Sequence, residues 1–167
     1  MIKSGSYLAG GVAAIVAFAM PALAKDSLGV FESWGAFRDA DTPRCYAISE
    51  AENIRGKADY RAFLSVSFWP KQQVRGQVHF RLSREKSKNA RVTASISGRR
   101  FTLTGGSADV WAQDKRMDAA IVAAIRSARS MSITTLDRQG KALVDTYALR
   151  GSATAIDAAT LGCSRLR

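Results

Sequence analysis

The chain is poor in the residues that most catalytic and metal sites require. Its 167 residues include one histidine, two cysteines and three prolines. Two cysteines and one histidine without a short Cys-x-x-Cys spacing are a poor ligand set for zinc. The sequence also lacks a Gly-x-Ser-x-Gly nucleophile motif and a Gly-x-x-x-x-Gly-Lys-Ser/Thr phosphate-binding motif. We therefore expect no metal centre, no nucleotide site and no cofactor.

Long apolar runs are absent except near the N-terminus. Residues 7–19 form an uncharged run that follows Lys3 and precedes the helix-breaking Pro21. The small-x-small sequence Ala22-Leu23-Ala24 comes next, and this order of features is typical of a cleavable secretory signal peptide. A permanent membrane anchor is the alternative, but it needs about 20 apolar residues. We expect cleavage after Ala24.

A signal peptide at 1–24 leaves residues 25–167, which we expect to form a single β-rich domain with no transmembrane span. This predicts a periplasmic protein, with outer-membrane association or secretion as alternatives. Negative charge is scarce, since 25 lysines and arginines face 14 acidic residues and give a net charge of +11. Such a charge favours anionic partners. Candidates are an anionic envelope polymer, lipid head groups or an envelope protein, whereas export argues against nucleic acid. A solvated basic surface without a ligand is the alternative. The sequence does not indicate an oligomeric state.

The two cysteines, Cys45 and Cys163, both lie after the signal segment. Outside the cytoplasm a single pair of cysteines is most simply interpreted as one disulfide. Two buried free thiols are the alternative. A bridge between these positions would join both ends of the domain.

Most of the chain alternates apolar and polar residues with the two-residue period of a half-buried strand. The expected strands cover 30–38, 44–49, 64–69, 77–83, 91–97, 99–104, 131–136 and 142–149. The period changes to three and four at 117–128, which predicts an amphipathic helix. A second helix is expected at 152–161, ending at Gly162 with Cys163 just beyond it. These elements predict a β-dominated α+β fold, an antiparallel sheet or sandwich with two short helices.

Basic residues are concentrated in one stretch of the chain, in which Glu85 is the only acid. If strands 77–83, 91–97 and 99–104 are neighbours, these charges crowd one sheet face and form an anion-binding patch. Protection of edge strands by charge is the alternative interpretation. The patch would comprise Arg75, Arg81, Arg84, Lys86, Lys88, Arg91, Arg99 and Arg100.

His79 lies on the polar side of its strand, where a surface histidine is the simplest interpretation and a Ser-His-Asp triad is the alternative. Trp34, Trp69 and Trp111 could form a sugar-binding platform, although each neighbours apolar residues and fits core or rim packing. Three tryptophans in one cleft with His79 would favour a sugar-binding module or a hydrolase. Tryptophans inside the core, with the arginines and lysines outside, would favour a binding protein without catalysis.

Two segments carry a family resemblance. Phe31-Glu32-Ser33-Trp34 followed by Arg44-Cys45-Tyr46-Ala47-Ile48, together with the closing segment 117–157, resemble the invasion-associated locus B family of alphaproteobacterial envelope proteins. Further cysteines that are frequent in that family are missing here. The resemblance implies a β-rich, periplasmic or outer-membrane-associated protein without catalysis. The leading hypothesis is a non-enzymatic envelope protein that binds an anionic surface or a protein partner. A periplasmic hydrolase or a sugar-binding module is the alternative.

Overall fold

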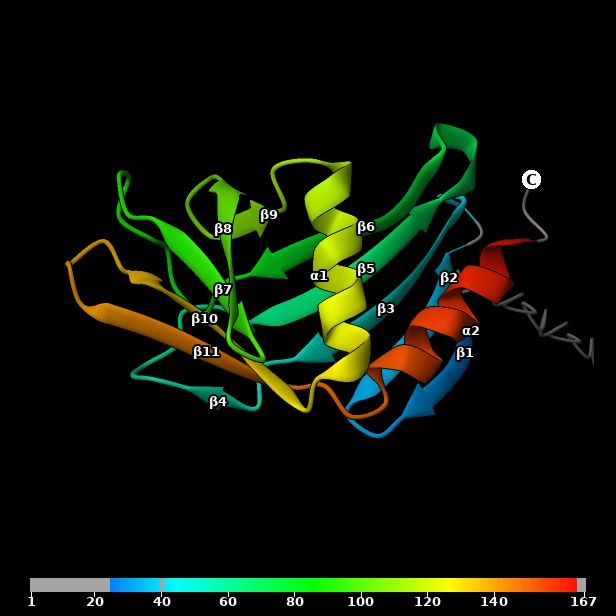
Figure 1. The fold of residues 1–167 in the computed structure, drawn as a ribbon, viewed down its shortest axis with the longest axis horizontal. Coiled ribbons are helices and arrows are strands. Elements are labelled where there is room, and N and C mark those ends of the chain that lie inside the picture. Colours follow the sequence, from blue (N-terminus) through cyan, green and yellow to red (C-terminus); the bar gives the residue numbers. More distant parts are fainter. Residues whose placement is uncertain (1–24, 40, 165–167) are drawn as a thin grey trace, which may run out of the picture.

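The computed structural model describes residues 25–39 and 41–164 and has two helices against one large antiparallel sheet (Figure 1). The expected signal peptide at 1–24 therefore lies outside the described residues. The strands are β1 (Asp26–Phe31), β2 (Trp34–Asp39), β3 (Arg44–Glu50), β4 (Asn53–Ile54), β5 (Phe63–Trp69), β6 (Val74–Arg81), β7 (Val92–Ile96), β8 (Arg99–Gly105), β9 (Asp109–Trp111), β10 (Ser130–Leu136) and β11 (Ala142–Ala148). The helices are α1 (Lys115–Ser127), α2 (Ser152–Ser164) and the short 3-10 helix Pro70–Gln72. The β-dominated α+β prediction is confirmed.

The sheet curls back on itself. Its order is β1-β2-β3-β5-β6-β9-β8-β7-β10-β11-β4, and every pairing is antiparallel. Only residues 51 and 52 separate β3 from β4, so the strand beside β5 continues almost directly into the strand beside β11. The last strand of this order, β4, is thereby tied to the third strand, β3, and the loops beside β4 are brought close to those that follow β6.

Alternation along the strands separates a core face from an outer face. Leu64 and Val66 of β5 are fully buried with Val78 and Phe80 of β6, and they belong to one hydrophobic core that includes residues of both helices. The residues between them, such as His79, point to the outer face of the sheet. Figure 1 shows α1 lying across β5 and β6 and α2 lying across β1 and β2.

The expectation of one strand over 30–38 is wrong. Residues 32 and 33 form a tight turn between β1 and β2, and Glu32 adopts a positive φ of 54°. The dense aromatic residues on both sides hid this turn, because it contains no glycine or proline. Trp34 begins β2, is fully buried, and donates its indole N–H to the carbonyl oxygen of Ala148 at 3.0 Å.

Both helices are found where they were expected, but the second helix ends later. Asp114 caps α1 by accepting the backbone N–H of Met117 at 2.8 Å, and α2 continues through Gly162 to Ser164. Gly162 is therefore not the end of the helix. A Cβ at this position would lie 2.5 Å from the Leu28 side chain of β1, so the glycine permits close packing of α2 on the sheet.

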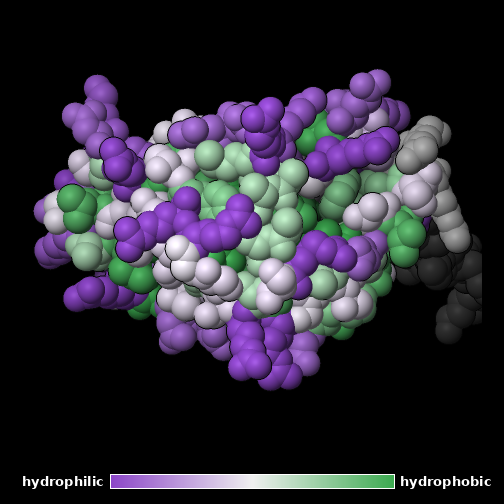
Figure 2. All heavy atoms as spheres, viewed as in Figure 1, coloured by the Kyte–Doolittle hydropathy of each residue, from purple (hydrophilic) through white to green (hydrophobic). Residues whose placement is uncertain are grey.

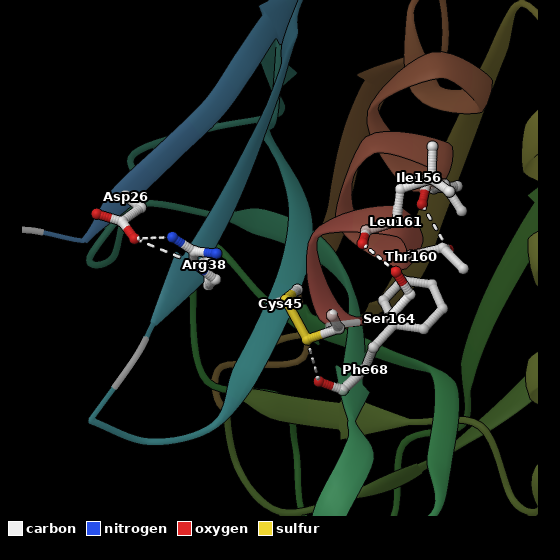
Figure 3. The surroundings of a disulfide bond; sticks show 9 residues. Asp26, Arg38, Cys45, Phe68, Ile156, Thr160, Leu161 and Ser164 are labelled. Carbon is white, nitrogen blue, oxygen red and sulfur yellow. Dashed lines mark hydrogen bonds and ion pairs between the residues drawn. A yellow bond between two sulfur atoms is a disulfide. The ribbon is translucent and has the colours of Figure 1, made fainter. Parts of the chain in front are cut away.

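The predicted disulfide between Cys45 and Cys163 is confirmed, with Cα atoms 5.6 Å apart. Cys163 lies in the last turn of α2 rather than beyond the helix, and the bridge fastens this turn to β3 (Figure 3). Both cysteines are buried. Among residues 25–39 and 41–164, no helix is long and apolar enough to cross a membrane.

Candidate functional site

Three connecting segments meet at one end of the curled sheet and enclose a pocket of about 750 Å³. They are the segment between β4 and β5, the segment between β6 and β7, and the turn between β10 and β11. We call this cavity the loop-end pocket. Its charged lining consists of Lys57, Arg84, Arg138 and Lys141 together with Asp59, Glu85 and Asp137. In Figure 2 hydrophilic side chains surround most of the outline of this face, including the end that holds the pocket.

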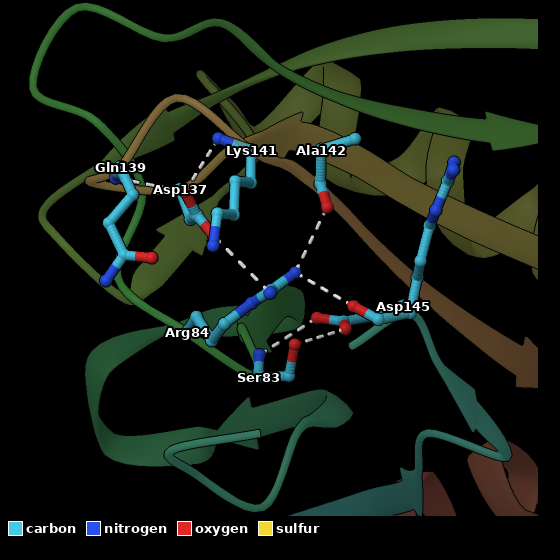
Figure 4. Close-up of polar contacts among 8 residues, drawn as sticks. Ser83, Arg84, Asp137, Gln139, Lys141, Ala142 and Asp145 are labelled. Atoms are coloured by element: carbon cyan, nitrogen blue, oxygen red, sulfur yellow. Dashed lines mark hydrogen bonds and ion pairs between the residues drawn. The ribbon is translucent and has the colours of Figure 1, made fainter. Parts of the chain in front are cut away.

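Beside the pocket, a buried carboxylate holds the start of the β6–β7 segment in place. Asp145 of β11 is fully buried and accepts the backbone N–H of Ser83 at 2.9 Å and its hydroxyl at 2.5 Å (Figure 4). Burial raises the pKa of Asp145, and the two hydrogen bonds from Ser83 and the charge of Arg84 oppose this shift only in part. Asp145 therefore holds Ser83, the residue before the pocket-lining Arg84, and is itself shielded from solvent.

Arg84 fastens the three segments to one another. Its guanidinium lies 3.3 Å from the Asp137 carboxylate and donates to the carbonyl oxygens of Arg55 at 2.9 Å and Ala142 at 3.1 Å (Figure 4). Gly56 lies against this guanidinium, since a Cβ there would be 2.9 Å from it. Because one carboxylate and two carbonyl groups already surround Arg84, we interpret this residue as a brace for the pocket wall.

The β10–β11 turn and the β6–β7 segment are also joined by charge. Asp137 accepts the backbone N–H groups of Gln139 at 3.0 Å and Lys141 at 2.8 Å, which shapes the turn. At its tip, Arg138 pairs with Glu85 at 2.7 Å, and Glu85 also accepts the hydroxyl of Tyr60 at 3.2 Å. The hydrogen bonds from Arg138 and Tyr60 lower the pKa of Glu85, which keeps this carboxylate ionised.

The remaining cations of this region are lysines. A smaller cavity of about 380 Å³, the side pocket, adjoins the loop-end pocket and shares Glu85 and Arg138 with it. Lys86 and Lys88 line the side pocket, and Lys57 and Lys141 line the loop-end pocket. Within residues 25–39 and 41–164, none of these four lysines forms an ion pair with a carboxylate. Lys86 donates its ammonium to the carbonyl oxygens of Ser87 and Lys88, both at 3.2 Å, so its third N–H remains for a ligand. The other three lysines face an anion from solution without a carboxylate partner among the described residues.

The structure does not gather the eight residues of the expected patch on one sheet face. Strand β9 lies between β6 and β8, so the strands at 77–83 and 99–104 are not neighbours, although β7 and β8 do pair. Three of the eight, Arg84, Lys86 and Lys88, reach the two pockets. Arg81 lies on the outer face, where it pairs with Asp109.

The other four predicted patch residues are dispersed. Arg75 lies in β6 beside the bulge at Gly76, and Arg91 is exposed just before β7. Arg99 and Arg100 begin β8 at the turn of the β7–β8 hairpin, at the opposite end from Arg91. Basic side chains that are close in sequence project in several directions from strands and loops. The eight residues therefore do not form a single anion-binding surface.

Sequence reasoning missed four residues of the site, namely Lys57, Tyr60, Arg138 and Lys141. Two of these lie in the segment after β4, and the other two lie in the β10–β11 turn. The two pairs are about 80 positions apart in the chain, and the pairing of β4 with β11 brings their segments together. The turn itself was recognisable in the sequence, but its position beside the β6–β7 segment was not.

His79 and two of the three tryptophans share the outer face of the sheet. The ring of His79 stacks on Trp111 with centroids 4.9 Å apart, and its Nε2 lies 2.9 Å from Asp109 Oδ1. Burial lowers the pKa of His79, although Asp109 opposes the shift. Trp69 packs against the guanidinium of Arg44 at 5.0 Å on the same face, while Trp34 is in the core. The three tryptophans therefore do not form one platform.

A Ser-His-Asp arrangement is present only in outline. Ser65 of β5 lies directly across from His79 in the sheet, and Asp109 holds the histidine ring. Among the described residues no hydrogen bond joins the Ser65 hydroxyl to His79, although a nucleophile and its base should lie within hydrogen-bond reach. Ser65 is also nearly buried, with 6% of its surface exposed. The arrangement lacks the contact that would activate a serine.

The described part of the chain contains no group of three or more His, Cys, Asp or Glu residues that could hold a metal ion. The chemistry that the site offers is electrostatic: four lysines line the two cavities, while arginines pair with two of the acidic residues, Glu85 and Asp137. Comparisons with protein-family models, with curated proteins and with solved structures give no match for this chain.

Proposed function

We propose that this chain is a non-enzymatic, exported envelope protein that binds an anionic partner through the loop-end pocket and the side pocket. The observation that carries the proposal is a set of four lysines around two adjoining cavities, none of which pairs with a carboxylate of the described residues. They are Lys57, Lys86, Lys88 and Lys141. Phosphate and carboxylate groups are the ligands that such a cluster of ammonium groups attracts.

The internal ion pairs support a binding role for the lysines. Glu85 and Asp137 would otherwise compete for these cations, but Arg138 holds the first and Arg84 holds the second. The arginines thus neutralise two of the acidic groups and fix the pocket walls, while the lysines keep their charge for a ligand. A solvated basic surface would not need such an arrangement around a cavity.

Location and family enter the proposal from the sequence. A signal peptide at 1–24 would carry the chain to the periplasm, and the disulfide between Cys45 and Cys163 fits an oxidising compartment. Its partner there would be an anionic envelope polymer, a lipid head group or an envelope protein. The resemblance to the invasion-associated locus B family stays a prediction, and it agrees with a binding role without catalysis.

Binding of inorganic polyphosphate to the mature chain tests the proposal. We expect binding that weakens as salt rises, because exposed charges are screened over about 8–10 Å near physiological ionic strength. The double variant Lys57→Gln/Lys141→Gln should bind roughly five- to thirtyfold more weakly, which corresponds to about 1–2 kcal/mol for two exposed contacts.

The matched control is the double variant Lys71→Gln/Lys115→Gln. It removes the same charge from two exposed lysines, one in the 3-10 helix and one at the start of α1, and neither lines a cavity described above. Its affinity should stay close to that of the unmodified chain. Equal losses in both double variants would show that only net charge matters, and the proposed site would be abandoned.

A further inference from the structure

A continuous row of side chains leads from the loop-end pocket onto the outer face of the sheet. We call this row the outer-face ladder; it consists of Tyr60, Arg81, Asp109, His79, Trp111 and Phe63. The ladder begins in the pocket, because Tyr60 lines the cavity and donates its hydroxyl to Glu85. It then crosses β5, β6 and β9, which are neighbours in the sheet.

Each side chain of the ladder contacts at least one other member. The guanidinium of Arg81 lies over the Tyr60 ring, 4.4 Å from its centroid, and pairs with Asp109. Asp109 also binds His79, whose ring stacks on Trp111 at an interplanar angle of 15°. Phe63 packs edge-on against His79 with centroids 5.3 Å apart. Interlocked rotamers lower the entropy lost on binding, so the ladder is a preorganised surface.

The composition of the ladder differs from that of an ordinary solvent-facing sheet. Its six side chains are all only partly buried, so rings and planar polar groups reach the surface together. Flat aromatic rings match the C–H faces of sugar rings, while guanidinium, carboxylate and imidazole groups exchange hydrogen bonds with sugar hydroxyls. Inorganic phosphate or a polyphosphate chain offers no apolar face to such a surface.

From this continuity we infer that the ligand of the proposed pocket is an anionic glycan, with its acidic groups at the lysines of the loop-end pocket and its sugar rings along the outer-face ladder. The inference rests on the proposed function, because it names the class of anion that the pocket binds. It assigns Trp111 and His79 to binding of the glycan backbone and Lys57 and Lys141 to binding of its charge.

Two polyanions of similar length separate the parts of this inference. Oligogalacturonate carries carboxylates on sugar rings, whereas polyphosphate carries negative charge without sugars. We expect Trp111→Ala to weaken oligogalacturonate binding about tenfold or more, as for a central aromatic contact, and to leave polyphosphate binding unchanged. Trp111→Phe, which keeps a ring, should restore most of the oligogalacturonate affinity. Thermal melting shows whether each variant is folded.

Trp69→Ala is the matched control, because Trp69 is also a partly buried tryptophan on the outer face but lies outside the ladder. It should bind both polyanions as the unmodified chain does. A folded Trp111→Ala variant with unchanged oligogalacturonate affinity, or equal losses in Trp69→Ala and Trp111→Ala, would overturn the ladder assignment and leave the pocket intact. Absence of binding to both polyanions in the unmodified chain would instead overturn the proposed function itself.

Discussion

Removing the bridge between Cys45 and Cys163 should lower the stability of the fold by roughly 2–5 kcal/mol. The two cysteines are separated by 118 positions. In the chain-entropy model a loop of 100 residues contributes about 4.7 kcal/mol, and the greater length here adds only about 0.15 kcal/mol. Residual structure in the unfolded chain reduces this value, which is why the expected range extends downward.

The structure also indicates which element will be destabilised most when the disulfide is removed. The bridge fastens the last turn of α2 to β3. The same helix packs on β1, β2 and β3 and contributes buried residues such as Ile156 and Ala159 to the core. For a domain of this size, a loss of 2–5 kcal/mol corresponds to a fall in melting temperature of about 7–17 °C. Amide protons of α2 should lose their exchange protection first, because its end is no longer tethered.

Equilibrium unfolding in urea, with and without a thiol reductant, measures this effect on one and the same sequence. The variant Cys45→Ala/Cys163→Ala is the control; it should unfold near the midpoint of the reduced chain and should not respond to reductant. Coincident unfolding curves for the oxidised and reduced chains would refute the reasoning. Two reactive thiols in the denatured, unreduced protein would show that the pairing itself is absent.

Five further outcomes are expected. Burial raises the pKa of Asp145, so ionisation of this carboxyl group disfavours the folded state. The free energy of unfolding should therefore fall as pH rises from about 4 through the raised pKa. In urea titrations, Asp145→Asn should remove this part of the pH dependence. His79 is the only histidine, so its single NMR titration should report a pKa below 6.5, and Asp109→Asn should lower it further; a pKa above 6.5 would contradict the burial described here. Since the folded state favours neutral His79, stability should also decrease as pH falls through 6.5. A fluorophosphonate probe should not label Ser65, and mass spectrometry of the exported protein should find Lys25 as the first residue, whereas a dominant species beginning at Met1 would exclude cleavage.

The strands were predictable because alternation has a direct physical cause. In β5, Leu64 and Val66 belong to the hydrophobic core, while Ser65 and Ser67, which are also buried, lie on the opposite face of the strand. Successive side chains of a strand point to opposite faces of the sheet, so a two-residue period of apolar residues places all of them on one face. The helix at α1 was predictable for a similar reason, from its three-and-four spacing of apolar residues.

Two local predictions were wrong, namely the end of α2 at Gly162 and the uninterrupted strand through Glu32. Gly162 was interpreted as the end of α2, because glycine commonly follows a helix. In the structure it is a point of close approach to Leu28, a role that depends on the tertiary packing. The turn at Glu32 lacks the glycine or asparagine that usually marks a positive φ, so the sequence contained no signal for it.

The candidate site was predictable only in part, because it depends on which loops the sheet brings together. Lys86 and Lys88 belonged to the expected patch, but Lys57 and Lys141 come from segments that meet only after β4 pairs with β11. Arg84 was expected to bind an anion from solution and instead pairs with Asp137. Ion-pair partners of this kind depend on the three-dimensional fold, and the order of charges along the chain does not predict them.

A residue-resolved NMR titration of the mature chain with polyphosphate tests the central claim most directly. The account predicts amide shift changes concentrated in three segments, at residues 56–60, 84–88 and 137–141, with little change along α1 and α2. Saturation at one set of residues would identify a defined anion site, in agreement with the pocket geometry. Shift changes spread evenly over exposed lysines and arginines across the molecule would contradict the account, since they would show that net charge alone attracts the anion.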